Sequence, residues 1–400
     1  VPIDLSSSSA SSSTGEPGPT ADYVDVFVTC VTSTDSVFFR FVDYDAQYNL
    51  LLEDMAAFYN GPRGATAAIR CAVEVGEGKL YAALHEGRWL RAQAVALHDE
   101  GQRVECYFVD DGITSFLTPG ALLELDEAFT SLAYQAMPCQ LDGLAEYADC
   151  DGVADIVSDV LLGKSLVAEI INIEEPMSVV MHDTWGADDV DLNAVIFQRL
   201  TGPKLPEKGC VGRCHLSHIR GDGLICIQMC GPGLKVLNKF MSAVNEYCKD
   251  ASEPVDRPEF GKVYACRYRA DLVFYRAVLA SPDPLPSGEF KMQYIDFGNE
   301  DHAYLSELRN VDILGDFLVR LPYQALLCRL RNLSPEDGFR WSDRTSTAFL
   351  DIVGPDNPEL LIRVTDPATE NQPAVVELFK RHPETRRLTC INLELSRVAP

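Results

Sequence analysis

Residues 294–299 read YIDFGN, and this stretch follows two other aromatic side chains at strand-like spacing. A methylated guanidinium keeps few N–H groups and spreads its charge over a plane, so ring faces attract it by ~0.5–2 kcal/mol per good contact. Any single aromatic side chain in a β-rich segment is more often a core residue. Four of them together with one carboxamide indicate a site for a weakly hydrated cation. These side chains are Tyr268, Tyr275, Tyr294, Phe297 and Asn299.

The stretch belongs to an internal repeat with a period of about 185 residues. Four ordered pairs of segments match at offsets of 183, 185, 186 and 189, and such a series does not arise by chance. The sequence therefore predicts a duplication. The pairs are GKLYA (78–82) with GKVYA (261–265), RWLRA (88–92) with VFYRA (273–277), CYFVDDG (106–112) with MQYIDFG (292–298), and LAYQAMPCQLDGL (132–144) with LPYQALLCRLRNL (321–333).

The repeat extends to both sides of these central blocks. Before each block, two β-rich runs around a polar turn predict a hairpin, and apolar residues at i, i+3, i+4 and i+7 then predict a helix. After each block we expect a helix and further strands. The predicted hairpins are 24–43 and 210–229, the helices 48–60 and 234–248, and the later strands 164–184 and 347–366.

The central blocks have short strands with turn residues every 8–12 positions, which is typical of a small β-barrel. The flanking pieces are too small for separate cores, so we expect them to form a second barrel that is split in sequence by the first. The expected fold is mainly β with helices, of the α+β class. A Ser-rich leader, residues 1–21, is expected to be disordered. Two modules follow at 22–203 and 204–400, with inner barrels at about 76–126 and 259–311; the junction at 200–209 fits a hinge or a tight turn equally.

Composition limits the classes of partner. The chain has 60 acidic and 34 basic residues, a net charge of −26, which disfavours nucleic acid and favours basic partners. No run approaches the ~20 apolar residues of a membrane span.

Thirteen cysteines without a secretory signal are read as free thiols in a reducing compartment. One cluster lies on a single predicted strand, where alternate side chains face opposite ways, so no metal site is expected. Its members are Cys210, Cys214, His215 and His218.

The central block of the second copy resembles a Tudor domain. The resemblance is carried by G-K-V-Y-A, F-Y-R-A-V, Y-I-D-F-G-N-E, L-S-E-L and L-P-Y-Q-A. The split flanks resemble the staphylococcal-nuclease-like OB-fold half of an extended Tudor module. Two such modules would cover residues 22–400. The motifs are specific in the second copy and eroded in the first.

The resemblance implies roles for particular residues of the second copy. The aromatic cage that holds a dimethylarginine falls on Tyr268, Tyr275, Tyr294 and Phe297, and the amide that hydrogen-bonds the guanidinium falls on Asn299. A Phe at 297 replaces the more usual Tyr. Supporting residues are expected to be Arg276 and Asp296, which pair as scaffold, and Glu300 and Asp301, which face further basic residues of a bound peptide.

The first copy departs from this pattern. The corresponding positions are Leu84, Leu90, Phe108, Asp111 and Ile113, so one aromatic remains and the amide is absent. Two interpretations stay open. The first copy is a spacer and packing platform, or Asp110, Asp111 and nearby acidic loops bind an unmethylated arginine through charge-assisted hydrogen bonds.

The function expected from the resemblance is that of a non-enzymatic adaptor without a cofactor. It would bind dimethylated, and also unmodified, Arg-rich tails of PIWI-type proteins in the piRNA pathway. The expected location is the cytoplasm, in perinuclear germ granules. The alternative is an RNA-binding or nuclease-like protein acting through the OB-fold halves. The flanks contain no repeated set of carboxylates and arginines for metal-assisted cleavage, and RNA is not the expected direct ligand.

Overall fold

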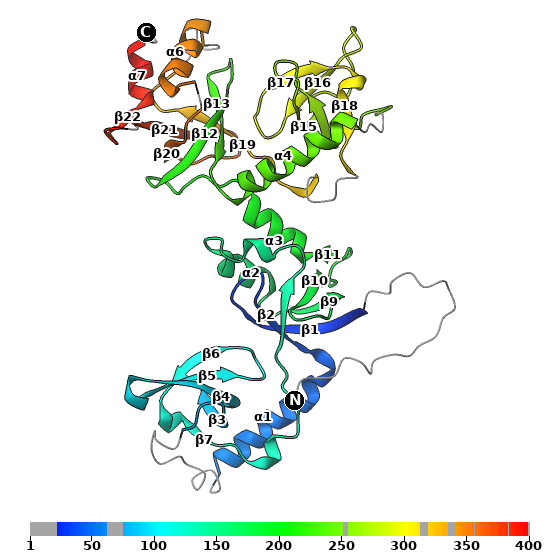
Figure 1. Ribbon diagram of the computed structural model, residues 1–400, viewed down its shortest axis with the longest axis vertical. Helices are drawn as coiled ribbons and strands as arrows, with labels where there is room; N and C mark the ends of the chain where they lie inside the picture. The colour runs from blue at the N-terminus through cyan, green and yellow to red at the C-terminus, as the bar shows by residue number, and fades with distance from the viewer. Residues whose placement is uncertain are drawn as a thin grey trace. The chain divides into compact units, whose positions relative to one another are not determined.

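The computed structural model describes residues 22–61, 75–250, 255–312, 319–334, 341–355, 357–382 and 384–398. The chain forms two compact units, Val1–Phe197 (unit 1) and Gln198–Pro400 (unit 2), shown in Figure 1. Each unit contains one copy of the repeat. The leader at 1–21, expected to be disordered, lies outside the described residues. Within the described residues, no helix is long and apolar enough to cross a membrane.

The two units have the same order of helices and strands. In unit 1 these are β1 (Asp22–Val31), β2 (Val37–Phe41), α1 (Asp45–Tyr59), β3 (Leu80–His85), β4 (Arg88–His98), β5 (Arg103–Phe108), β6 (Thr114–Leu117), β7 (Leu122–Glu124), β8 (Met137–Leu141), α2 (Val153–Leu161), β9 (Ser165–Asn172), β10 (Met177–Asp183), β11 (Val190–Asp191) and α3 (Leu192–Thr201), whose last turn belongs to unit 2.

In unit 2 they are β12 (Val211–Ile219), β13 (Leu224–Met229), α4 (Pro232–Asp250), β14 (Tyr264–Arg267), β15 (Phe274–Leu279), β16 (Phe290–Tyr294), β17 (Glu300–Ala303), β18 (Leu308–Asn310), β19 (Ala325–Leu330), α6 (Asp343–Val353), β20 (Leu360–Asp366), β21 (Ala374–Arg381), β22 (Leu388–Cys390) and α7 (Ile391–Val398). Both predicted hairpins and both predicted helices before the central blocks are confirmed.

The flanking strands of each unit close into a barrel. In unit 1 the order is β10-β8-β2-β1-β9, and β9 pairs back with β10; in unit 2 it is β21-β19-β13-β12-β20, and β20 pairs back with β21. The β8–β10 and β19–β21 pairs are parallel and the others antiparallel. In Figure 1, β1 and β2 lie beside β9 and β10 although the inserted strands separate them in sequence. The predicted split barrel is therefore confirmed.

The inserted block of each unit is a five-stranded antiparallel sheet wrapped around its own core. The strand orders are β6-β5-β4-β3-β7 and β17-β16-β15-β14-β18. In unit 2, Tyr264, Met292 and Leu308 lie in the core on one side of the sheet. On the other side, Val244 and Cys248 of α4 pack against Val263, Ala265 and Phe274. The apolar stripe of the helix thus anchors the inserted sheet.

One predicted strand segment is wrong. Residues 347–353 lie in helix α6, and only the later part of 347–366 forms a strand, β20. Buried Thr345, Phe349 and Val353 recur every four residues, and the side chain of Ser342 caps the helix by accepting a hydrogen bond from the Thr345 amide. This spacing and cap are signals for a helix. The strands that correspond to 164–184 are β20 and β21.

A buried arginine–aspartate pair joins the inserted sheet to the split barrel in each unit. Arg276 of β15 is fully buried, and its Nε and Nη2 donate to the two carboxylate oxygens of Asp296, at 2.9 and 2.6 Å. Arg276 also donates to the carbonyls of Leu321 and Pro322, and Asp296 accepts from the Gln324 amide. The segment that leads into β19 is thereby fixed to the inserted sheet.

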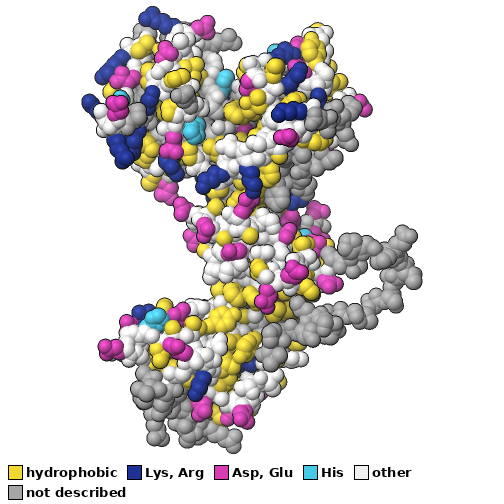
Figure 2. All heavy atoms as spheres, viewed as in Figure 1, with side chains coloured by type: hydrophobic (Ala, Val, Ile, Leu, Met, Phe, Trp, Pro, Cys, Tyr) yellow, Lys and Arg dark blue, Asp and Glu magenta, His cyan; other side chains and the backbone are white. Residues whose placement is uncertain are grey.

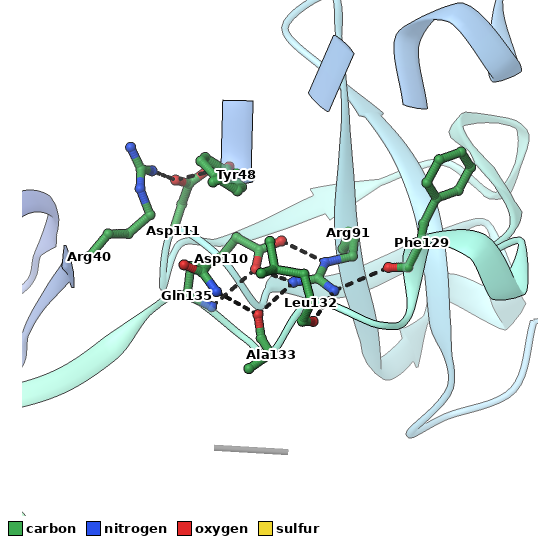
Figure 3. Close-up of polar contacts among 9 residues, drawn as sticks. All are labelled: Arg40, Tyr48, Arg91, Asp110, Asp111, Phe129, Leu132, Ala133 and Gln135. Atoms are coloured by element: carbon green, nitrogen blue, oxygen red, sulfur yellow. Dashed lines mark hydrogen bonds and ion pairs between the residues drawn. The ribbon is translucent and has the colours of Figure 1, made fainter. Parts of the chain in front are cut away.

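Unit 1 repeats this arrangement, as Figure 3 shows. Arg91 donates to both oxygens of Asp110, at 2.9 and 2.6 Å, and to three carbonyls of the segment before β8. The Gln135 backbone N–H donates to Asp110 at 3.1 Å. Two copies that have diverged elsewhere therefore keep the same buried polar network.

We expect Asp296→Ala to destabilise unit 2 by ~3–5 kcal/mol, because the Arg276 guanidinium stays buried without its counter-charge. Urea unfolding followed by fluorescence would measure this change. Glu300→Ala is the control: it breaks the exposed Lys291–Glu300 pair and should cost less than ~1 kcal/mol. Equal losses for the two variants would contradict a structural role of the buried pair.

Candidate functional site

A cavity of about 190 Å3 opens on unit 2 where the inserted sheet meets the split barrel. The structure brings together all five residues that the sequence singles out for a cage. Three further residues line the cavity and were missed from the sequence. The lining residues are Ser217, His218, Tyr268, Asp271, Tyr275, Tyr294, Phe297 and Asn299.

The four rings stand edge to face around the cavity. Ring centroids lie 5.2 Å apart for Tyr268 and Tyr294, 6.3 Å for Tyr275 and Tyr294, and 4.9 Å for Tyr275 and Phe297, with interplanar angles of 74–85°. Perpendicular rings at these separations are mutually stabilising. All four rings border one small space.

Tyr294 differs from the other three aromatics in its burial. It is only 2% exposed and belongs to the core of the inserted sheet, whereas Tyr268, Tyr275 and Phe297 are half-buried. Its hydroxyl lies 3.4 Å from the Cys266 thiol. Burial, and then the neighbouring Cys266, raises the pKa of the Tyr294 phenol. Tyr294 is thus the floor of the cavity and a core residue at once.

The turn after β16 places the other two members of the YIDFGN stretch. Gly298 has φ of +86°, and a Cβ there would lie 2.3 Å from Cys226 Sγ of the split barrel, so only glycine fits. The Ser217 hydroxyl donates to the Phe297 carbonyl at 2.8 Å. The Asn299 backbone carbonyl accepts from the Tyr294 amide, and among the described residues the Asn299 carboxamide makes no hydrogen bond. That carboxamide is available to a ligand.

Asp271 adds a negative charge that the sequence analysis did not assign. The Tyr275 hydroxyl donates to Asp271 Oδ2 at 2.9 Å, and the Val273 amide donates to Oδ1. Burial, and then the hydrogen bond to Asp271, raises the pKa of Tyr275 to about 12. The carboxylate is four residues from Tyr275, in a turn, and the spacing alone does not show that it reaches the cavity.

Ser217 and His218 come from β12 of the split barrel, and Ser217 lies 80 residues before Phe297 in sequence. Burial, and then the nearby Arg220, lowers the pKa of His218 from 6.5, so its ring is neutral at pH 7. The Cys and His cluster considered from the sequence lies along this strand: Cys214 points into the barrel core, and His215 contacts the Asn357 carbonyl at 3.1 Å. Within the described residues, no group of three or more potential ligands is arranged around a metal position.

The supporting acidic residues lie at the edge strand β17. Glu300 is exposed and forms an ion pair with Lys291 at 2.6 Å. Asp301 is half-buried and accepts a hydrogen bond from the His302 amide. Neither lines the cavity, so any contribution of these two carboxylates to binding lies outside the cage.

Strand pairing corrects one residue of the first copy. In unit 2, Cys266 pairs with Tyr275, and in unit 1 Ala83 pairs with Leu90. Ala83 therefore corresponds to Cys266. Two residues later, His85 corresponds to Tyr268. Leu84, the residue expected there, pairs with Trp89 and is exposed. The β3–β4 hairpin has a shorter turn than its counterpart in unit 2, which shifts the sequence alignment.

The remaining cage positions of unit 1 do not form an aromatic cage. His85 and Phe108 lie with ring centroids 4.8 Å apart, Leu90 is buried and Ile113 is half-buried. The Leu and Ile side chains offer no π face. Only the ring pair of His85 and Phe108 is comparable with unit 2.

The two aspartates of unit 1 already have cationic partners within the chain, as Figure 3 shows. Asp110 pairs with Arg91, and Asp111 pairs with Arg40 Nη1 at 2.5 Å. The Arg40 guanidinium lies 4.4 Å from the ring centroid of Tyr48. Burial raises the pKa of Asp111 in spite of Arg40. The hypothesis that Asp110 and Asp111 bind the arginine of a partner is therefore not supported by this arrangement.

The chain is similar to several known proteins. The chain is 29% identical over 327 residues to Tudor domain-containing protein 7A of Danio rerio, an alignment that covers 79% of this chain and 29% of that protein. Among solved structures, extended Tudor domain TD3 from mouse TDRD1, in complex with a MILI peptide containing dimethylarginine, gives a TM-score of 0.41 at 21% identity and covers 48% of this chain and 93% of that one. Extended-Tudor 10-11 of Drosophila melanogaster gives 0.37 at 16% identity, covering 93% and 98%.

The chain spans less than a third of the length of that curated relative. The family model of the Tudor domain matches residues 18–143 and 211–332, more than half of the chain and one region in each unit. The chain therefore belongs to the Tudor domain family, as the resemblance of the YIDFGN block predicted.

Proposed function

We propose that unit 2 is a reader of dimethylarginine in Arg-rich peptides and that the chain acts as a non-enzymatic adaptor. The supporting observation is the single cavity that four aromatic side chains, the Asn299 carboxamide and the Asp271 carboxylate line together. The dimethylguanidinium would lie between the half-buried rings of Tyr268, Tyr275 and Phe297. The floor of the cavity would be Tyr294.

The rings, the carboxamide and the carboxylate of the cavity each match one property of this ligand. Ring faces attract a cation whose methyl groups have reduced its hydration. The Asn299 carboxamide oxygen would accept a hydrogen bond from an N–H group that methylation leaves in place. Asp271, held by Tyr275 and the Val273 amide, adds long-range attraction to the positive charge. No part of this cavity requires a metal or a nucleophile.

The dimethylated form would be preferred because it loses fewer hydrogen bonds to water when it enters the cavity. An unmodified guanidinium presents five N–H donors, and a cage with one amide acceptor and one carboxylate leaves several of them without partners after desolvation. Dimethylation removes two donors and adds apolar surface that the rings bury. We expect an affinity of tens of micromolar, about 6 kcal/mol, because a disordered peptide must be ordered on binding.

Unit 1 enters this proposal as a packing platform without a methylarginine cage. The proposed partners are Arg-rich tails of the PIWI type, and the proposed setting is the germ granule. Residues outside the cage, among them Glu300 and Asp301, would contact basic residues that flank the methylated arginine.

The first test is calorimetric titration of the chain with one Arg-rich peptide in unmodified, asymmetrically dimethylated and symmetrically dimethylated forms. We expect the dimethylated forms to bind more tightly, and Phe297→Ala to weaken their binding about tenfold, because one ring contact is worth ~1–2 kcal/mol. Tyr304→Ala is the matched control, since Tyr304 is an exposed aromatic just after β17 that does not line the cavity.

Phe297 is preferred to Tyr294 for this test because removing the buried Tyr294 would damage the core. Tyr294→Phe, which keeps the ring, should bind normally. If Phe297→Ala and Tyr304→Ala bind the methylated peptide equally well, the cavity is not the binding site. If the unmodified peptide binds as tightly as the dimethylated ones and Phe297→Ala weakens the binding of all three equally, recognition of methylation by the cage is excluded.

A pH profile of the same titration gives an independent test. Below the lowered pKa of His218 the imidazole gains a proton, and this positive charge in the cavity lining repels the ligand. Tyr275 remains a neutral phenol up to its pKa of about 12. We therefore expect constant affinity from pH 7 to 10 and a decline only in acid, below the lowered pKa of His218. His218→Gln should abolish that decline; an unchanged decline would contradict a position of the cation near His218.

A further inference from the structure

The split barrel of unit 1 exposes aromatic and aliphatic side chains on the outer face of its β1–β9–β10 sheet. Trp185, just after β10, is 83% exposed, and Tyr23 on β1 is 59% exposed. Ile171 on β9 and Ile173 just beyond it are also exposed. Several large apolar side chains around one sheet face mark a docking surface more often than scattered single residues do.

Hydrogen bonds and ring contacts hold this face in place. The Trp185 indole Nε1 donates to the Ser165 carbonyl at 3.2 Å. Tyr23 and His182 lie with ring centroids 6.2 Å apart, and His182 Nε2 is 3.0 Å from a Glu169 carboxylate oxygen. The exposed rings are therefore fixed before a partner arrives, which lowers the entropy cost of binding.

The charged side chains of the same barrel are almost all acidic. Its two segments, residues 22–44 and 137–197, contain seventeen Asp and Glu but only one Arg and one Lys. Both cations are engaged internally: Arg40 pairs with Asp111, and the Lys164 ammonium donates to the carbonyls of the last turn of α2. Figure 2 shows acidic side chains gathered over this barrel, where Figure 1 labels β9 and β10. The partner that fits this face carries positive charge.

Unit 2 provides a matched face with a different charge. The corresponding segments, 211–231 and 325–398, contain twelve acidic and twelve basic residues. Tyr23 pairs with Glu169 in unit 1, and the equivalent pair in unit 2 is Val211 with Arg363. By the same strand pairing, Phe379 of unit 2 is equivalent to His182 of unit 1. The acidic and aromatic character is thus a property of unit 1 and not of the barrel fold.

We propose that the β1–β9–β10 face of unit 1, centred on Trp185 and Tyr23, docks a cation-rich peptide segment independently of methylation. The exposed rings would stack on guanidinium groups, and the surrounding carboxylates would pair with them. This face shares no residue with the cage positions of either unit. The inference therefore does not depend on the reader function proposed for unit 2.

The test is titration of the whole chain with a labelled, unmodified peptide of alternating Arg and Gly, followed by fluorescence anisotropy. Trp89 and Trp341 are buried, so the emission of the exposed Trp185 should shift on binding and report the site directly. We expect affinity to fall steeply as the ionic strength rises. Trp185→Ala should weaken binding about five- to tenfold. Glu169→Arg combined with Asp25→Lys, at an exposed position of β1 that pairs with Val167, should weaken it about tenfold or more.

Matched controls separate this face from the cage. Phe379→Ala in unit 2 and Phe297→Ala in the cage should leave binding of the unmodified peptide unchanged. Glu169→Gln keeps a hydrogen-bonding partner for His182 and removes only the charge, so it tests the charge if the double reversal fails to fold. Thermal melting would verify each variant.

Two results would overturn the proposal. One is an unchanged affinity in folded Trp185→Ala and Glu169→Gln variants. The other is equal binding of an alternating Glu and Gly peptide, which would show that charge does not select the partner. Loss of binding in Phe297→Ala but not in Trp185→Ala would assign the unmodified peptide to the cage and likewise reject this face.

Discussion

The bidentate pair of Arg276 and Asp296 is the interaction on which the rest of unit 2 depends. It joins β15, the turn after β16 and the segment leading into β19, three parts of the chain that otherwise belong to two different sheets. A fully buried guanidinium is tolerated only when its donors have partners. The inserted sheet and the split barrel must therefore form in contact, and the same network in unit 1 imposes the same condition.

This pair explains why one turn serves both structure and binding. Asp296 turns inward to Arg276, Gly298 presses against Cys226, and the residues between and after them, Phe297 and Asn299, line the cavity. In unit 1 the inward aspartate and the glycine remain, and a Cβ on Gly112 would likewise collide with Phe38. Only the cavity positions have changed, to Asp111 and Ile113. The fold constrains alternate residues of the turn and leaves the others free to diverge.

The sequence alone predicted what depends on local spacing and on the repeat. Hairpins, amphipathic helices, the split barrel and the meeting of five residues at one cavity all follow from periodicity or from aligned motifs. Three features did not. Residues 347–353 were aligned to a strand because the repeat was extended past a loop of different length. His85 was missed because the β3–β4 turn is shorter than its counterpart. Asp271, Ser217 and His218 reach the cavity through tertiary packing, which no local pattern records.

The partner of Asp111 shows most clearly that local sequence patterns do not record tertiary contacts. It also changes where the net negative charge of the chain is expected to act. Arg40 is 71 residues away in sequence and neutralises the one carboxylate that replaces a cage aromatic. The net charge of −26 therefore does not express itself at the cage position of unit 1. Much of it lies instead on the split barrel of that unit, whose cations are used internally. Screened electrostatic attraction acts over about 8–10 Å, whereas a cation must touch a ring to gain from it. Attraction of a basic peptide and selection of a methyl group would therefore be separate properties. They would be located in different copies of one duplicated module.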